Sequence, residues 1–156
     1  MNIHLHQMSL GDLLVLRSGI DEEITSRGHV RTSSSLAGEL IERTVAVAYN
    51  GRLAPVGTKS VDVITSDDRG LQVKMRSLPK GDLRHWAFKE FEFDAAIVVA
   101  IDRATWMIDW ARELSRDEAE SIAKPHSQGW RIRMAAARTS GLDVTGKLQT
   151  AFQELT

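Results

Sequence analysis

Asp62, Gln72 and Lys74 place an acid, an amide and an amine at a spacing suited to chemistry on a phosphate. They lie in the segment 59–76, which predicts two short strands joined by a turn. Because side chains alternate between the faces of a strand, Gln72, Lys74 and Arg76 should share one face. A carboxylate and an amide oxygen can hold a hard cation, and a lysine can contact the attacking water or the phosphate. The pattern predicts metal-assisted cleavage of a phosphodiester.

Asp62, a spacer of nine residues and then Gln72-Val73-Lys74 resemble the motif of the PD-(D/E)xK nuclease superfamily. That superfamily includes type II restriction endonucleases, archaeal Holliday junction resolvases and many small uncharacterised bacterial proteins. The upstream segment 38–42 resembles the helix that supplies an additional acid in those enzymes. The similarity covers roughly residues 35–110 of the chain.

The resemblance implies an endonuclease that depends on Mg²⁺ or Mn²⁺ and acts on DNA in restriction, repair or recombination. Asp62 and the Gln72 side chain, with the backbone carbonyl of Val73, would hold the ion, and Glu42 would bind a second ion directly or through water. Lys74 would orient the attacking water or neutralise the developing charge. Contacts to the DNA phosphates are expected from nearby polar and basic residues, namely Lys59, Ser60, Arg76, Arg31 and Arg43.

The chain departs from the superfamily pattern at two positions. Val61 stands where the proline that gives the family its name would precede the acid. Gln72 replaces an acidic ligand, although some members of the superfamily also use glutamine there. A neutral amide oxygen brings no charge, so we expect a lower affinity for the ion.

Each candidate residue also has a purely structural alternative. Asp62 could be a solvated acid on an edge strand, and Gln72 and Lys74 could belong to the polar face of a half-exposed sheet. Glu42 falls just outside the expected buried arc of its helix (Leu36, Leu40, Thr44, Val47 and Ala48), and Glu39 lies at the opposite margin of that arc. Glu42 is preferred over Glu39 as the active-site acid because it matches the superfamily pattern.

Periodicity, capping residues and turn residues predict the elements that position these side chains. Helices are expected at about 9–27, beginning at Ser9; at 36–49, where the preceding serines 33–35 can act as a cap; at 115–124, opened by a Ser115–Glu118 capping box; and at 148–155. Strands are expected at 61–64, 71–76, 94–101, 105–110 and 130–134, with Trp106, Ile108 and Trp110 on one face of the fourth. The segment 79–93, with His85 and Trp86, is expected to form a loop or lid. This order predicts an α/β (mixed α+β) protein with a restriction-endonuclease-like core, in which helices flank a mixed sheet of four or five strands. We expect a single domain over 1–156, with an N-terminal helix in 1–30, the motif region at 35–110 and a helix-strand-helix region at 111–156.

Composition narrows the class of protein. The apolar fraction of 42% and charged fraction of 26% are those of an ordinary globular protein. The absence of cysteine excludes disulfides and thiolate metal sites. With no signal peptide pattern and no long apolar run, we expect a cytoplasmic protein without a membrane partner. The net charge of −1 does not indicate a nucleic-acid binder, but basic residues cluster at 74–89 and 124–138.

Two rival functions and a question of assembly remain open at the level of sequence. The chain could be a catalytically weak nuclease fold that binds DNA or another protein, or an accessory or immunity-type protein that uses its acidic N-terminal helix. One catalytic centre cuts one strand, so we expect a homodimer for cleavage of a duplex, with its contact supplied either by the aromatic residues of 86–110 or by the amphipathic first helix. A companion subunit could also supply recognition.

Overall fold

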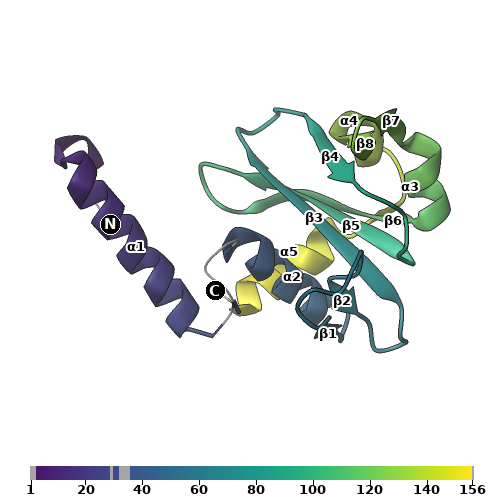
Figure 1. Ribbon diagram of the computed structural model, residues 1–156, viewed down its shortest axis with the longest axis horizontal. Coiled ribbons are helices and arrows are strands. Elements are labelled where there is room, and N and C mark those ends of the chain that lie inside the picture. The colour runs from purple at the N-terminus through teal and green to yellow at the C-terminus, as the bar shows by residue number, and fades with distance from the viewer. Residues whose placement is uncertain (1–2, 29, 32–35, 156) are drawn as a thin grey trace. The chain divides into compact units, whose positions relative to one another are not determined.

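The computed structural model describes residues 3–28, 30–31 and 36–155, and the chain divides into two compact units, Met1–Leu40 and Ile41–Thr156. The serines 33–35, predicted to cap the second helix, lie outside the described residues. The elements (Figure 1) are, in order, η1 Leu5–Gln7, α1 Leu10–Ser26, α2 Leu36–Ala48, β1 Arg52–Leu53, β2 Val63–Ile64, β3 Gly70–Leu78, β4 His85–Phe88, β5 Ala95–Asp102, β6 Ile108–Ser115, α3 Arg116–Ile122, β7 Lys124–His126, β8 Gly129–Arg133, α4 Met134–Arg138, β9 Leu142–Asp143 and α5 Thr145–Leu155. Among the described residues, every helix is too short or too polar to cross a bilayer. The expectation of a single nuclease-like domain stays a prediction.

The N-terminal unit contains the predicted first helix, α1. Ser9 caps it by accepting a hydrogen bond from the backbone N–H of Asp12 at 3.2 Å, and Gly28 follows its end with φ of 74°. No described side chain of α1 is buried within the chain, and Leu10 and Val15 are 74% and 73% exposed.

A six-stranded mixed sheet forms the centre of the second unit, in the order β1-β2-β3-β5-β6-β9. Only β3 and β5 run parallel; the other neighbours are antiparallel. The side chains of residues 95–101 of β5 are all buried, as expected for a strand covered on both faces. The mixed α/β class is confirmed, with six strands in this sheet where four or five were expected.

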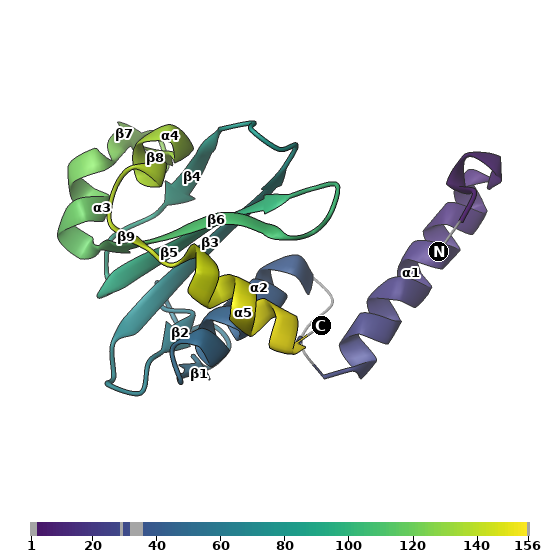
Figure 2. The same cartoon turned by 180° about the vertical axis from the view of Figure 1, so that it is seen from behind.

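One face of the central sheet is covered by helices. From Ile41 onward, α2 lies beside α5 on this face (Figures 1 and 2), and Gln149 of α5 donates to the backbone carbonyl of Ile108 in β6 at 2.8 Å. The buried residues of α2 are Ile41, Thr44, Val45 and Ala46, so its buried arc is centred about one residue away from the predicted arc. A shift of one residue turns the helix by roughly 100°.

The other face is covered by a second sheet, in the order β4-β8-β7, together with α3 and α4. Trp86 and Phe88 of β4 are buried against Val98 of β5, and the Trp86 ring packs edge-on against Trp110 at 5.7 Å between centroids. The prediction of a loop or lid at 79–93 is therefore wrong for residues 85–88. Their alternation spans only four residues, which is too short to distinguish a strand from an aromatic loop.

The connection between β5 and β6 is longer than expected. Trp106 adopts φ of 59°, donates its N–H to the Asp102 carbonyl at 2.8 Å and is 42% exposed. It therefore belongs to the turn, and it does not share a buried strand face with Ile108 and Trp110 as predicted. At the far end of β6, the Ser115–Glu118 capping box that opens α3 is confirmed.

Candidate active site

The polar face of β3 lies under the second sheet. The register pairs Gln72 with Ala96, Lys74 with Val98 and Arg76 with Ala100, and these β5 residues belong to the core beneath β4. The Lys74 ammonium lies 5.4 Å from the centroid of the Phe88 ring, and Arg76 Nε donates to the His85 carbonyl at 3.0 Å. The three polar side chains are therefore half-buried within the fold, where an ordinary surface strand would expose them.

Asp62 lies at the point where the ladder between β2 and β3 ends. Its N–H donates to the Leu71 carbonyl at 2.8 Å, and its carboxylate oxygen Oδ2 accepts a hydrogen bond from the N–H of Val73 at 2.7 Å. The N–H and C=O of one strand residue project toward the same neighbour, so the Val73 carbonyl also points to this edge. The half-buried acid is thus fixed beside β3.

Lys74 links three elements electrostatically. Burial lowers the pKa of its ammonium, while the negative charge of Asp62 opposes that shift; the nearby Lys89 lowers the pKa and Glu42 raises it. Glu42 comes from α2, Asp62 from the segment before β2, and Lys74 from β3. The fold therefore brings both predicted acids within electrostatic reach of the lysine.

Gln72 contributes a polar atom that the surrounding chain leaves unsatisfied. Its Oε1 is buried and has no hydrogen-bond partner among the described residues. Buried acceptors are nearly always satisfied, so such an atom indicates a missing donor or ion. Two carboxylates, an amide oxygen and a backbone carbonyl are the hard donors that Mg²⁺ prefers, and the residues fit such an ion.

The charge of this donor set is low. The residues that the structure describes contain no group of three or more His, Cys, Asp or Glu side chains arranged to hold a metal. With two acids and one amide, Asp62, Glu42 and Gln72 would hold a divalent cation weakly.

Two of the residues predicted to contact phosphates, Lys59 and Ser60, are already engaged by an acid. Lys59 pairs with Glu90, with 2.8 Å between Nζ and Oε2, and the hydroxyl of Ser60 donates to Oε1 of the same carboxylate at 2.5 Å. Both the Lys59 ammonium and the Ser60 hydroxyl are therefore engaged by Glu90, a residue that the sequence did not single out. A bound phosphate would have to displace its carboxylate.

Of the remaining predicted contacts, Arg43 lies exposed on α2. Arg31 belongs to the N-terminal unit, where its backbone N–H donates to the Glu39 carboxylate. That hydrogen bond gives Glu39 a structural role within its own unit. Lys89, placed near Lys74 by its effect on the ammonium pKa, is a further cation that the sequence reasoning did not select.

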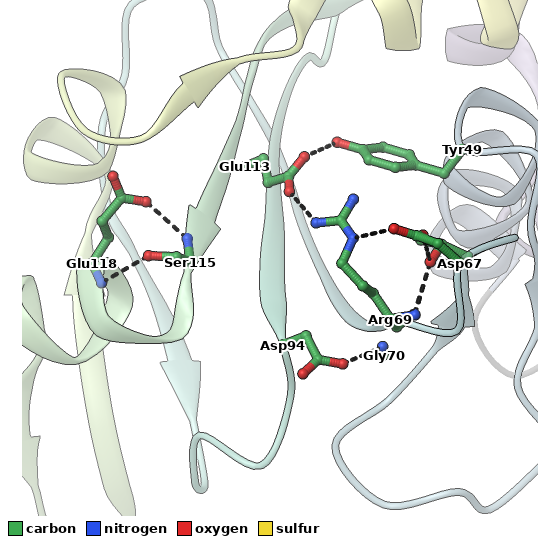
Figure 3. Close-up of polar contacts among 9 residues, drawn as sticks. Tyr49, Asp67, Arg69, Gly70, Asp94, Glu113, Ser115 and Glu118 are labelled. Atoms are coloured by element: carbon green, nitrogen blue, oxygen red, sulfur yellow. Dashed lines mark hydrogen bonds and ion pairs between the residues drawn. The ribbon is translucent and has the colours of Figure 1, made fainter.

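A polar network holds the turn between β2 and β3 against β6 (Figure 3). Arg69 Nη1 donates to Glu113 Oε1 at 2.7 Å, and the Tyr49 hydroxyl donates to the other carboxylate oxygen at 2.6 Å. Burial, and then the hydrogen bond to Glu113, raise the pKa of Tyr49 far above its ordinary value. These contacts fix the hairpin that carries Asp62 and Lys74.

The start of β3 is anchored separately. The Gly70 N–H donates to Asp94 Oδ2 at 2.7 Å, and the Asp94 N–H donates back to the Gly70 carbonyl at 2.8 Å (Figure 3). This reciprocal pair sets the register between β3 and β5. It thereby sets which β3 side chains lie under the second sheet.

The chain matches no protein-family model and no curated protein. Its function is therefore inferred from the site itself. The site combines two acids, a lysine within electrostatic reach of both and an unsatisfied amide oxygen, and these groups can bind a cation and stabilise negative charge on a phosphate.

Proposed function

We propose that the protein is a Mg²⁺-dependent DNA endonuclease of the PD-(D/E)xK type, with Mn²⁺ as an alternative ion. The observation that carries this proposal is the position of Lys74, half-buried within reach of Asp62 and Glu42 and one strand repeat from the unsatisfied Gln72 oxygen. A half-buried amine within electrostatic reach of two acids has a clear use when a metal and a phosphate share the site. A purely structural sheet face has no need of it.

In this mechanism Asp62, Glu42, the Gln72 amide oxygen and the Val73 carbonyl would hold the ion. A bound Mg²⁺ supplies Lewis acidity toward the scissile phosphate and lowers the pKa of a bound water. The Lys74 ammonium donates hydrogen bonds to that water or to a phosphate oxygen. Its half-buried position strengthens this interaction, because the local dielectric is lower than that of water.

The proposal includes an assembly. Cutting both strands of a duplex needs two centres, and a homodimer is the simplest way to supply them. The exposed apolar side chains of α1, among them Leu10, Leu14 and Val15, could provide a dimer contact. A companion subunit that recognises the target, and a cytoplasmic location, stay predictions of the same kind.

A second candidate function is a nuclease fold with a weak site that binds DNA or another protein. The neutral Gln72 favours it, and so does the hydrogen bond that engages Asp62 Oδ2 with the Val73 N–H. Such a module would bind without cutting and would show no measurable affinity for magnesium. An accessory protein acting through its N-terminal helix would instead ignore nucleic acid.

Cleavage assays separate these candidates. Supercoiled plasmid and short single-stranded, duplex and branched DNA are incubated with the protein in Mg²⁺, Mn²⁺ or EDTA. We expect metal-dependent cutting that Asp62→Ala abolishes and that Asp117→Ala, an exposed acid of α3, retains. The substrate cut fastest would distinguish restriction from resolution. Equal cutting by Asp62→Ala and the wild type would overturn the proposal.

A further inference from the structure

The three-stranded sheet has two chemically different faces. Its inner face carries Trp86, Phe88 and Ile132, which are buried in the core. Paired residues of neighbouring strands share a face. The opposite face, called here the outer face, is formed by His85, Ala87, Lys124, His126, Arg131 and Arg133.

The outer face is rich in cations and contains no acid. His85 pairs with Arg133, and Arg131 of the central strand lies between Ala87 and Lys124. Strands β4, β7 and β8 contain no Asp or Glu. Lys124, Arg131 and Arg133 form no ion pair within the described part of the chain, so their charge is not neutralised there.

The charges also gather in space. Partial burial lowers the pKa of His85, and every charged group that adds to the shift is a cation: Arg131, Arg76, His126 and Arg84. Arg84 alone of these makes an ion pair within the described residues, with 3.8 Å between its Nη2 and Asp82 Oδ2. Side chains from β3, β4, β7 and β8 and the loop before β4 therefore converge on one basic surface.

We propose that this outer face binds the phosphodiester backbone of a nucleic-acid duplex. Residues two apart on a strand, such as Arg131 and Arg133, lie roughly 7 Å apart on the same face, which gives an extended row of cations for a regular row of phosphates. The small Ala87 leaves the Arg131 side chain room beside it.

The side chains of the outer face favour a duplex over two other anionic partners. The face contains no Phe, Tyr or Trp on which unpaired bases could stack. Apart from Ala87 it contains no apolar side chain that could enter a membrane interface. A duplex backbone needs only positive charge and hydrogen-bond donors, and the face supplies both.

The outer face adjoins the candidate active site through Arg76. This residue follows Lys74 by two positions on the same face of β3, and its guanidinium donates a hydrogen bond to the backbone carbonyl of His85. Lys74 itself lies on the inner side of β4, 5.4 Å from the Phe88 ring, so a duplex held on the outer face would reach the proposed catalytic groups around the edge of β4. The inference deepens the proposed function. Duplex binding by the outer face does not require the nuclease activity; only the statement that the bound duplex is the substrate rests on the proposed function.

Binding of a fluorescein-labelled DNA duplex by the full-length protein in EDTA tests the inference without cleavage. Arg131→Thr/Arg133→Thr removes two cations from the outer face, and Arg52→Thr/Lys147→Gln removes two from β1 and α5. We expect the first variant to bind about tenfold more weakly and to lower the slope of log affinity against log salt by roughly 2. The second should bind as the wild type does. Arg131→Lys/Arg133→Lys, which keeps the charge, should retain most of the affinity.

The outcomes separate this inference from the proposed function. Loss of duplex binding in the outer-face variant, with an unchanged unfolding midpoint, supports the outer face even if no magnesium-dependent cleavage is found. Unchanged duplex binding overturns it, even if the wild type cleaves DNA. Equal losses of duplex binding in both double variants would also overturn it. So would a wild type that binds phosphatidylserine vesicles or polyglutamate as tightly as it binds the duplex, because binding would then depend on charge alone.

Discussion

At the scale of single residues, Gln72 is the one proposed side-chain ligand of the metal that carries no charge. Its buried Oε1 has no hydrogen-bond partner among the described residues, and such an atom destabilises a fold by about 1–3 kcal/mol. Gln72→Met should therefore increase the free energy of unfolding in EDTA and abolish magnesium-dependent cleavage. Urea unfolding and plasmid cleavage measure the two effects. A variant that is less stable in EDTA would show that the amide already has a structural role.

The opposite substitution tests the charge of the same position. Gln72→Glu adds a ligand charge, so the magnesium concentration that gives half-maximal cleavage should fall by roughly tenfold. In EDTA the variant should be less stable than the wild type, because a charged carboxylate would replace a buried amide oxygen that has no hydrogen-bond partner among the described residues. Magnesium should restore that stability. An unchanged magnesium requirement would place the ion away from Gln72.

Lys74 makes a prediction about pH. Burial holds the pKa of Lys74 in the folded protein below the ordinary 10.5. At a pH between the folded pKa and 10.5, the unfolded chain therefore binds more protons than the folded chain. Stability due to this residue should therefore rise with pH across that window, as the penalty for burying the charge disappears. The difference in free energy of unfolding, wild type minus Lys74→Met, should increase as the pH rises toward 10.5. Urea titrations at several pH values measure it, and a constant difference would contradict the burial of this amine.

At the scale of elements, the β2–β3 hairpin depends on the Arg69–Glu113–Tyr49 network. Glu113→Ala leaves the Tyr49 hydroxyl and the Arg69 guanidinium without their shared acceptor, so we expect a loss of about 1–3 kcal/mol in the free energy of unfolding. Glu120→Ala, at an exposed acid of α3, should change it by less than about 0.5 kcal/mol. Chemical denaturation compares the two. Equal effects would mean that the network contributes little.

The sequence predicted the elements whose signals are local. Ser9 and the Ser115–Glu118 capping box marked helix starts, and the apolar run after Asp94 marked β5, because capping and burial leave strong patterns. It did not predict β1 or β9, which are two residues long and form only by pairing with longer strands. Strand β4 was missed because its pattern spans four residues.

The candidate site was predictable in part for the same reason. Alternation along β3 placed Gln72, Lys74 and Arg76 on one face of the strand. The pairing register between β3 and β5 agrees with this placement. It could not reveal that this face lies beneath a second sheet, because β4 is too short to leave a clear strand pattern and its partner β8 is distant from β3 in the sequence. Glu90, the partner of Lys59 and Ser60, was missed on the same ground.

At the scale of the whole molecule, the proposed dimer is testable through α1. Leu14 is 56% exposed on this helix. Leu14→Lys should shift the protein from dimer to monomer in sedimentation velocity, because a charge cannot be buried unpaired in an apolar contact. Glu23→Lys, at an exposed position on the opposite side of α1, should leave the dimer intact. A wild type that sediments only as monomer at assay concentrations would contradict a dimer that cuts both strands.

Single-turnover nicking of supercoiled plasmid in magnesium is the most direct test of the central claim, that Lys74 is a catalytic residue of a metal-dependent nuclease. The comparison is between the wild type, Lys74→Met and Lys80→Met, which alters an exposed lysine just after β3. We predict that Lys74→Met lowers the rate by about 100-fold or more at unchanged duplex affinity, and that Lys80→Met cuts like the wild type. Equal rates for all three proteins, or no nicking by any of them, would contradict the claim.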